Sequence, residues 1–314
     1  MELNDASINS LIQRCILLID ELDLTYHYPS NTKHLLYLII TSFILKYGLK
    51  NEKMIISALK EIQIIVNQNE IPDNLVAHFE RKILFDEDGK PYTRKKIVID
   101  NYFSVPTINL LDSVIHEFNH AINSYKKEMS FTNEQIILRC GLSTSTFDKN
   151  NLVAGGTNKK NVYLEEVINT YQTEEIINII ASLANMNIEN EIINNTLYVV
   201  NSELNGQKYE SEAYYLQNKI CRSLIENKTF INTVSSLRLS GDIFDIEKWF
   251  NNIVYIDNAF EKLSTLLDKI SQEEVNYSKI KLSLFRKRKL KTIKNMTDEV
   301  FLIINEFNNN CSYK

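Results

Sequence analysis

The first seventy residues carry apolar side chains with the period of an α-helix. At the start of the chain they recur at spacings of three and one, at Ile8, Leu11, Ile12, Cys15 and Ile16. A similar stripe runs from Ile55 to Val66, and Gly48 before it is typical of a helix C-terminus. Pro29 interrupts the first part of the pattern. These residues predict three successive helices over residues 6–70.

The pattern changes in the middle of the chain. Two short apolar runs, Ile83–Phe85 and Ile97–Ile99, enclose a turn at Asp88-Gly89, and this arrangement predicts a hairpin. A second two-stranded element is predicted between residues 135–140 and 161–163. Between the two elements, apolar residues at helical spacing predict a helix over about residues 107–127.

The helical period returns after Leu164, and it predicts helices over 164–184, 209–227, 245–270 and 272–308. Together these patterns predict an α+β fold that is mostly helical. We expect a helical N-terminal region, a mixed α+β core and a helical C-terminal region, at residues 1–75, 76–200 and 201–314.

Composition narrows the class of protein. The chain has only 7 glycines and 4 prolines in 314 residues, which disfavours a sandwich or barrel with many tight turns. Acidic residues outnumber lysine and arginine by 40 to 35, so nucleic-acid binding is not expected as the main function. The most apolar stretch, Leu35–Leu45, is eleven residues long. A transmembrane helix needs about 20 such residues, so no transmembrane segment is expected.

Cysteine use and the N-terminal segment suggest where the protein works. The four cysteines lie far apart and form no CxxC pair, which argues against a thiolate zinc site or a redox motif. Such sparse cysteine is typical of reduced thiols in a cytosol. The first residues include Glu2 and Asp5 rather than the basic start of a secretory signal. We therefore expect a cytoplasmic protein.

The strongest chemical signal is the HExxH motif formed by His116-Glu117-Phe118-Asn119-His120. Residues four apart lie on the same face of a helix, so the two imidazoles can bind one metal ion. Glu117 can then reach a water molecule as general base. Zinc suits two imidazoles and a carboxylate, with a fourth position open for water. The alternative is that both histidines are ordinary residues of a surface or core helix.

A third ligand is expected downstream, because a His₂Glu zinc site takes a glutamate from another helix. The candidates are Glu165 and Glu166, near the start of the predicted helix 164–184. Either carboxylate can instead serve as favourable negative charge near a helix N-terminus. No histidine follows His120, so a site with a later third histidine is excluded. The histidines before the motif are expected to be structural or exposed, and they are His27, His34 and His78.

The segments HEFNH and LEEVINTYQT resemble the gluzincin metallopeptidases, the thermolysin-like class of zincins. They are most similar to uncharacterised bacterial members in which the HExxH helix precedes a helix of pattern L-x-E-G-x-T-E-Y-x-T. The matching positions are Leu164, Glu166, Ile168, Tyr171 and Thr173. The resemblance implies a zincin-like core, a Zn²⁺ ion on His116, His120 and Glu166, and a peptide or protein substrate.

Two positions depart from this pattern. The glycine after the ligand is Val167 here, and the Thr-Glu pair that follows in the family is Asn169-Thr170. In the family, an acidic residue four positions after the ligand glutamate orients a zinc-binding histidine. Thr170 has no carboxylate and cannot orient the histidine in this way. Asp112, one helical turn before His116, is a possible substitute.

Gluzincins also place a histidine or tyrosine where it can hydrogen-bond the oxyanion of the tetrahedral intermediate. Since no histidine follows His120, the resemblance assigns this part to a tyrosine, and Tyr209 is the first choice. The alternatives are Tyr163, Tyr214 and Tyr215.

The leading hypothesis is a zinc-dependent metallopeptidase with Glu117 as general base. A strand near residues 135–140 is expected to align an extended peptide by β-addition. The alternative is a zincin-fold protein that binds a partner and does not cleave it. The basic run Lys279–Lys294 is expected to be a solvated helix face, and a third hypothesis gives it an anionic partner, either a membrane surface or a nucleic acid.

Overall fold

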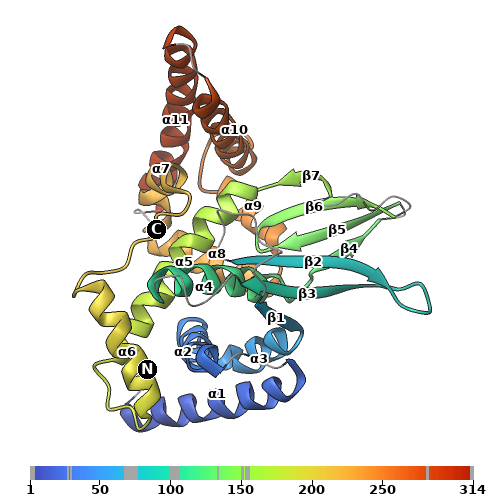
Figure 1. The fold of residues 1–314 in the computed structure, drawn as a ribbon. Helices are drawn as coiled ribbons and strands as arrows, with labels where there is room; N and C mark the ends of the chain where they lie inside the picture. The colour runs from blue at the N-terminus through green and yellow to red at the C-terminus, as the bar shows by residue number, and fades with distance from the viewer. Residues whose placement is uncertain are drawn as a thin grey trace. The chain divides into compact units, whose positions relative to one another are not determined.

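The computed structural model describes residues 4–26, 28, 30–66, 77–99, 107–132, 134–149, 152, 156–280 and 283–311. Over this part of the chain the fold is mostly helical with two small sheets, in agreement with the predicted α+β class (Figure 1). The chain divides into two compact units. Unit 1 comprises Met1–Ile122 and Gln172–Ser211, and unit 2 comprises Asn123–Tyr171 and Glu212–Lys314.

Each unit is built from two separate stretches of sequence. The compact units and the three consecutive regions predicted from the sequence therefore divide the chain in different ways. The chain passes from one unit to the other three times. Two of these passages fall inside helices, because α4 (Thr107–Ser124) and α5 (Val162–Leu183) each continue from one unit into the other.

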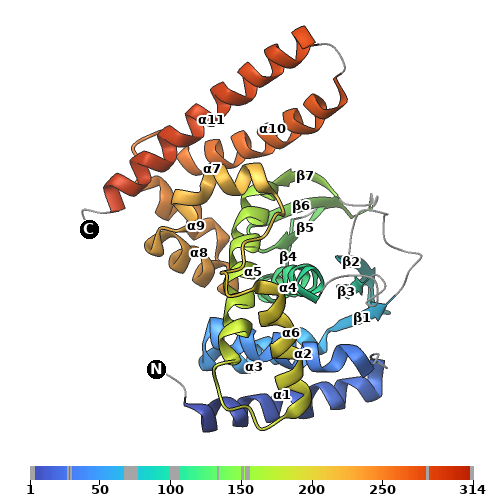
Figure 2. The ribbon, with the colours of Figure 1, turned by 60° about the vertical axis from the view of Figure 1, so that its left-hand side comes forward.

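The helices of unit 1 bury the apolar faces that the sequence predicts. Besides most of α4 and the second half of α5, they are α1 (Asp5–Tyr26), α2 (Ser30–Tyr47), α3 (Glu52–Lys60) and α6 (Glu191–Leu204), with a short 3₁₀ turn η1 (Leu49–Asn51). On α1 the predicted face is confirmed at four of its five positions, since Ile8, Leu11, Ile12 and Cys15 are buried and Ile16 is half-buried. Figure 2 shows α1 beside α2, where these apolar faces can pack against each other.

The sheet of unit 1 contains the predicted hairpin. It has the order β1-β3-β2, with β1 (Ile62–Val66) parallel to β3 (Pro91–Ile99) and β2 (Ala77–Phe85) antiparallel to it. The turn between β2 and β3 holds Gly89 at a φ of 74°, a conformation that favours glycine. Residues 62–66, predicted as the end of a helix, form β1 instead. A short apolar run of this kind fits a buried strand as well as a turn of a buried helix, so the sequence pattern does not distinguish the two.

The sheet of unit 2 is antiparallel, with the order β4-β5-β6-β7. Its strands are β4 (Met129–Phe131), β5 (Gln135–Cys140), β6 (Ser143–Asp148) and β7 (Thr157–Lys160). The prediction of a strand at 135–140 is confirmed, but its predicted pairing with 161–163 is wrong. β5 pairs with β4 and β6, and α5 begins at Val162. Since β6 reads STSTFD, it lacks the apolar alternation by which a strand is recognised.

The remaining helices of unit 2 surround a second apolar core. They are α7 (Tyr215–Ile225), α8 (Lys228–Ser240), α9 (Ile243–Asn251), α10 (Ala259–Lys279) and α11 (Ser283–Cys311). The helix predicted over 245–270 is two helices here. Asn258 has a left-handed φ of 52° immediately before α10, and Asn251 accepts a hydrogen bond from the Phe260 N–H. α10 then continues to Lys279, beyond the break predicted near residue 271.

Helix α6 lies in a segment, 185–205, for which the sequence pattern makes no prediction. Asn190 accepts a hydrogen bond from the Ile193 N–H and so caps its first turn, and Asn205 ends it in a left-handed conformation. Among the described helices, none combines the length and the apolar content that crossing a bilayer requires.

Candidate metal centre

Helix α4 presents both motif histidines on one side. Its opposite side is buried and holds the apolar residues Leu111, Val114, Ile115, Phe118 and Ile122. His116 and His120, four residues apart, lie one turn above the other, as the helical period requires. Their Nε2 atoms are 3.1 Å apart and their rings are nearly perpendicular, at 79°. His120 is buried and His116 is half-buried.

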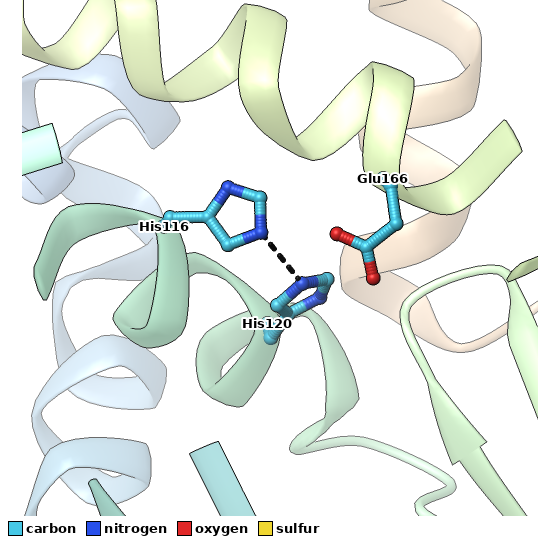
Figure 3. A group of neighbouring side chains, drawn as sticks. All are labelled: His116, His120 and Glu166. Atoms are coloured by element: carbon cyan, nitrogen blue, oxygen red, sulfur yellow. Dashed lines mark hydrogen bonds between the residues drawn. The ribbon is translucent and has the colours of Figure 1, made fainter. Parts of the chain in front are cut away.

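Glu166 completes a group of three potential ligands. One ligand atom from each of His116, His120 and Glu166 lies within 4.8 Å of the other two. Figure 3 shows the Glu166 carboxylate, on α5, directed toward the two imidazole rings. Glu166 is half-buried, like His116. The structure therefore brings together the three residues that the resemblance assigns to the metal.

The geometry of this group fits a small tetrahedral ion. Two imidazole nitrogens bound to zinc at 2.0–2.1 Å with a tetrahedral angle lie about 3.3 Å apart, close to the 3.1 Å between the two Nε2 atoms. A carboxylate oxygen needs a similar spacing, so Glu166 has to move inward by at most about 1.5 Å. Two imidazoles and one carboxylate are also the donor types that zinc accepts.

Glu165 has different surroundings from its neighbour Glu166. Its carboxylate forms an ion pair with Arg238 in which both side chains are almost completely buried. The second oxygen accepts a hydrogen bond from the Leu142 N–H at 2.7 Å. Gly141 allows this approach, because a side chain there would collide with the Glu165 carboxylate. Of the two candidate glutamates, Glu165 is thus a structural residue and Glu166 faces the histidines.

Glu117 lies next to the first histidine but is not a member of the ligand group. Its Oε2 accepts a hydrogen bond from the Phe79 N–H of β2, at 2.9 Å. This bond fixes the carboxylate between the HExxH helix and the edge of the unit 1 sheet. Glu117 thus combines a sequence position next to His116 with a fixed orientation of its carboxylate.

Asp112 takes part in a buried polar group with two residues that follow α6. Ser211 donates a hydrogen bond to its Oδ2 at 3.0 Å, and the Tyr209 side chain is hydrogen-bonded to Asp112 as well. Burial raises the pKa of Asp112, and the nearby His116 opposes that rise. Burial also raises the pKa of Tyr209, and the Asp112 carboxyl adds to the rise. Asp112 and His116 are therefore close enough to affect each other's charge, and the orientation of His116 by Asp112 stays a prediction.

The tyrosines proposed for oxyanion binding have separate environments. Tyr209 is tied to Asp112, and it also borders an open pocket of about 760 Å³ with Ile108, Asn109, Glu203, Leu204, Gln207, Lys208 and Glu210. Tyr163 and Tyr214 pack edge to face in unit 2, with ring centroids 6.2 Å apart. Tyr215 is mostly exposed on α7. Of these four, Tyr209 is the one whose hydroxyl is linked to Asp112, the acid beside His116.

A buried amide pair holds α4 against α5 within unit 1, and sequence reasoning missed it. Asn119 donates to Gln172 at 3.2 Å, and the Tyr47 hydroxyl of α2 bonds to both side chains. Asn119 and Gln172 are fully buried. Asn119 lies inside the HExxH motif. An asparagine is unfavourable in the interior of a helix, and this is the one sequence feature that could have indicated the buried amide pair.

Arg139 is a second residue that sequence reasoning missed. It is buried on β5 and donates to main-chain carbonyls of Asn123 and Gly141, each at 2.7 Å, and of Arg238 at 3.2 Å. The Asn123 carbonyl belongs to the last turn of α4, where a positive charge is favourable. Arg139 thus ties the end of the HExxH helix to the sheet of unit 2.

Comparison of the chain with protein-family models, with curated proteins and with solved structures gave no match. The resemblance to gluzincins therefore stays a prediction that depends on the motif residues.

Proposed function

We propose that this protein is a zinc-dependent metallopeptidase with a zincin-like core. The observation that carries the proposal is the convergence of His116, His120 and Glu166, with Glu117 beside them and outside the ligand group. Such a set of three ligands, with a glutamate next in sequence to the first histidine and outside the ligand group, is typical of hydrolytic zinc sites. His116, His120 and Glu166 would hold the ion.

A zinc ion in this position would polarise the scissile carbonyl and make water more acidic. Glu117 accepts the proton of the attacking water and returns it to the leaving amine, which serves both halves of the reaction. The hydrogen bond from Phe79 orients the Glu117 carboxylate for this exchange. Asp112 positions His116, and Tyr209 is proposed to stabilise the oxyanion. For that task its hydroxyl has to turn from Asp112 to the substrate.

The edge of strand β2 is the proposed binding site of the peptide substrate. β5, which the sequence suggested for this purpose, already pairs along both edges with β4 and β6. β2 pairs with β3 alone among the described strands. The Phe79 N–H points away from β3 to Glu117, and in an antiparallel pair the alternate residues Arg81 and Ile83 point the same way. An extended peptide added at this edge would run past the general base.

The cytoplasmic location predicted from the sequence is part of the proposal. None of the four cysteines is in a disulfide, as expected for a reducing compartment.

The proposal is tested by metal analysis of the purified protein, together with a cleavage assay on a peptide library. We expect about one zinc ion per chain and cleavage that stops when a chelator removes it. A protein that lacks zinc after purification and does not take it up would contradict the proposal. Zinc binding without any cleavage would support the alternative instead, a zincin-fold protein that binds a partner without hydrolysing it.

A further inference from the structure

The second half of α10 and the first half of α11 form a helical hairpin whose charge differs from that of the rest of the chain. Eight lysines and arginines and no acidic residue lie between Lys279 and Lys294, whereas the remaining residues include 27 basic and 40 acidic ones. Figures 1 and 2 show the two helices side by side. We call residues 272–294 the basic arm.

The basic arm lies beyond the apolar core of unit 2. The last buried residues of α10 are Ile270 and Ser271, and from Phe285 onward the first fully buried residue of α11 is Val300. Within the arm the two helices are held by an ion pair between Lys289 and Glu273 and by contact of the Arg286 guanidinium with the Tyr277 ring. The arm is therefore a defined helical pair whose outer surface no described residue covers.

One face of the arm carries basic side chains that form no ion pair among the described residues. Lys287, Lys291 and Lys294 follow the spacing of a single helix face, and Arg288 borders it. All four are exposed, and none of them forms an ion pair within the described part of the chain. Like charges so close together repel one another, so an uncompensated face of this kind favours an anionic partner.

Two large apolar side chains flank this basic face. Phe285 is 54% exposed and Leu290 is 48% exposed. Leu290 is three residues after Lys287 and four before Lys294, so it borders the lysines. Phe285, three residues before Arg288, borders the arginine on the other side of the face. The phosphates of a nucleic acid can pair with the lysines, but they do not bury a phenylalanine or a leucine away from water. An anionic bilayer satisfies both kinds of side chain, because lysines meet headgroups while neighbouring apolar residues enter the interface.

We propose that the basic arm is a docking site for the surface of an anionic phospholipid bilayer. Lys287, Arg288, Lys291 and Lys294 contact the headgroups, and Phe285 and Leu290 enter the interfacial layer. Residues 283–294 extend about 18 Å along the helix, more than one Debye length of about 8 Å at physiological salt, so charges at the base of the arm are largely screened from its far end. Docking of this kind is independent of the proposed peptidase activity.

Vesicle flotation with the full chain tests the proposal. The probes are vesicles of phosphatidylcholine alone and vesicles that also contain phosphatidylglycerol. We expect binding to the anionic vesicles only, with an affinity that falls steeply as salt is raised. The triple variant Lys287→Gln, Arg288→Gln, Lys291→Gln should bind roughly 100-fold more weakly, since each basic residue near an anionic bilayer contributes about fivefold.

A matched control removes the same charge elsewhere. Lys53, Lys159 and Lys228 are exposed and lie outside the basic arm, so their replacement by Gln should leave vesicle binding within about twofold of wild type. The pair Phe285→Ser, Leu290→Ser should weaken binding while its salt dependence stays the same. Melting curves establish that every variant is folded. Equal loss in the control triple would overturn the proposal, as would equal binding to neutral vesicles, no vesicle binding, or tighter binding to duplex DNA or RNA.

Discussion

Glu165 and Arg238 form an ion pair that is shut off from solvent, with side-chain exposures of 1% and 0%. The next residue along α5, Glu166, is half-buried and faces His116 and His120. Successive helical residues point about 100° apart, so one carboxylate can anchor the helix while its neighbour faces the histidines. The pair Glu165–Arg238, together with the bond from Leu142, fixes the rotation of α5 on which the direction of Glu166 depends.

The two neighbouring glutamates should respond differently to the same substitution. Glu165→Gln leaves the buried Arg238 charge uncompensated, and breaking a buried pair in this way costs about 3–5 kcal/mol. The melting temperature should therefore fall by about 10 °C. Glu166→Gln should leave the melting temperature of the metal-free protein within about 2 °C of wild type and should abolish zinc retention. Differential scanning calorimetry and metal analysis of both variants provide the comparison.

The opposite result is equally informative. If Glu165→Gln loses zinc while its melting temperature is unchanged, α5 is rotated from the orientation described above and Glu165 is the ligand.

The histidine pair makes a prediction about metal stoichiometry. His120→Ala removes one of two imidazoles, so the purified variant should retain less than a tenth of the zinc of wild type. His78→Ala is the matched control, because His78 lies on β2 and outside the ligand group. Its zinc content should equal that of wild type. Full zinc in the His120→Ala variant would show that the ion binds elsewhere.

Local patterns in the sequence were enough to predict helices α1 to α5, the β2–β3 hairpin and the placement of the HExxH motif on a helix, but not helix α6. Each of these depends on a repeated apolar spacing or on a turn residue such as Gly89, and both are visible over a few positions. Glu166 is different. Its preference over Glu165 depended on a family resemblance, because either carboxylate suits the start of a helix.

Other features depend on contacts between distant residues, which no local pattern contains. β6 is a polar strand whose pairing with β5 is set by a tight connection at Gly141 and Leu142. Arg238 is separated from Glu165 by 73 residues, and an arginine in α8 gives no sign that it will be buried. The crossing of both α4 and α5 between the two compact units is likewise a property of the folded chain.

The position of Gly141 makes a prediction about stability. Gly141→Ala places a methyl group against the Glu165 carboxylate at a φ of 56°, where non-glycine residues are already strained. We expect a loss of at least about 3 kcal/mol in the free energy of unfolding. Gly89→Ala is the control, because its φ of 74° is similar but nothing lies within 4 Å of the added carbon. It should cost only about 1–2 kcal/mol. Equal losses in urea unfolding would show that the contact with Glu165 is unimportant.

Two buried cysteines make a prediction about alkaline pH. Burial raises the pKa of Cys15 to about 11 and that of Cys221 to about 12. In the unfolded chain both thiols ionise near pH 8.5. The contribution of the neutral thiols to stability is therefore complete below pH 8.5 and is lost as the pH rises toward 11. Each cysteine steepens this loss by about 1.4 kcal/mol per pH unit.

The double variant Cys15→Ala, Cys221→Ala isolates this contribution. It should be less stable than wild type at pH 7, because small cavities are created. Its urea midpoint should nevertheless fall less steeply than that of wild type between pH 8.5 and 10.5. Parallel pH profiles for the two proteins would contradict the prediction.

The last prediction concerns Glu117, the proposed general base. Glu117→Gln keeps the size of the side chain, and its amide oxygen can still accept the hydrogen bond from Phe79. Zinc content and melting temperature should therefore match wild type. The amide cannot take a proton from water or return one to the leaving amine, so hydrolysis should fall by about 10²–10⁴-fold. The measurement is kcat on a peptide identified in the library screen, with zinc content determined on the same samples. A Glu117→Gln variant that cleaves at the wild-type rate would rule out Glu117 as the base. Phe79→Pro removes the N–H donor, so the Glu117 carboxylate loses its fixed orientation. This second variant should therefore have a lower kcat while zinc remains bound.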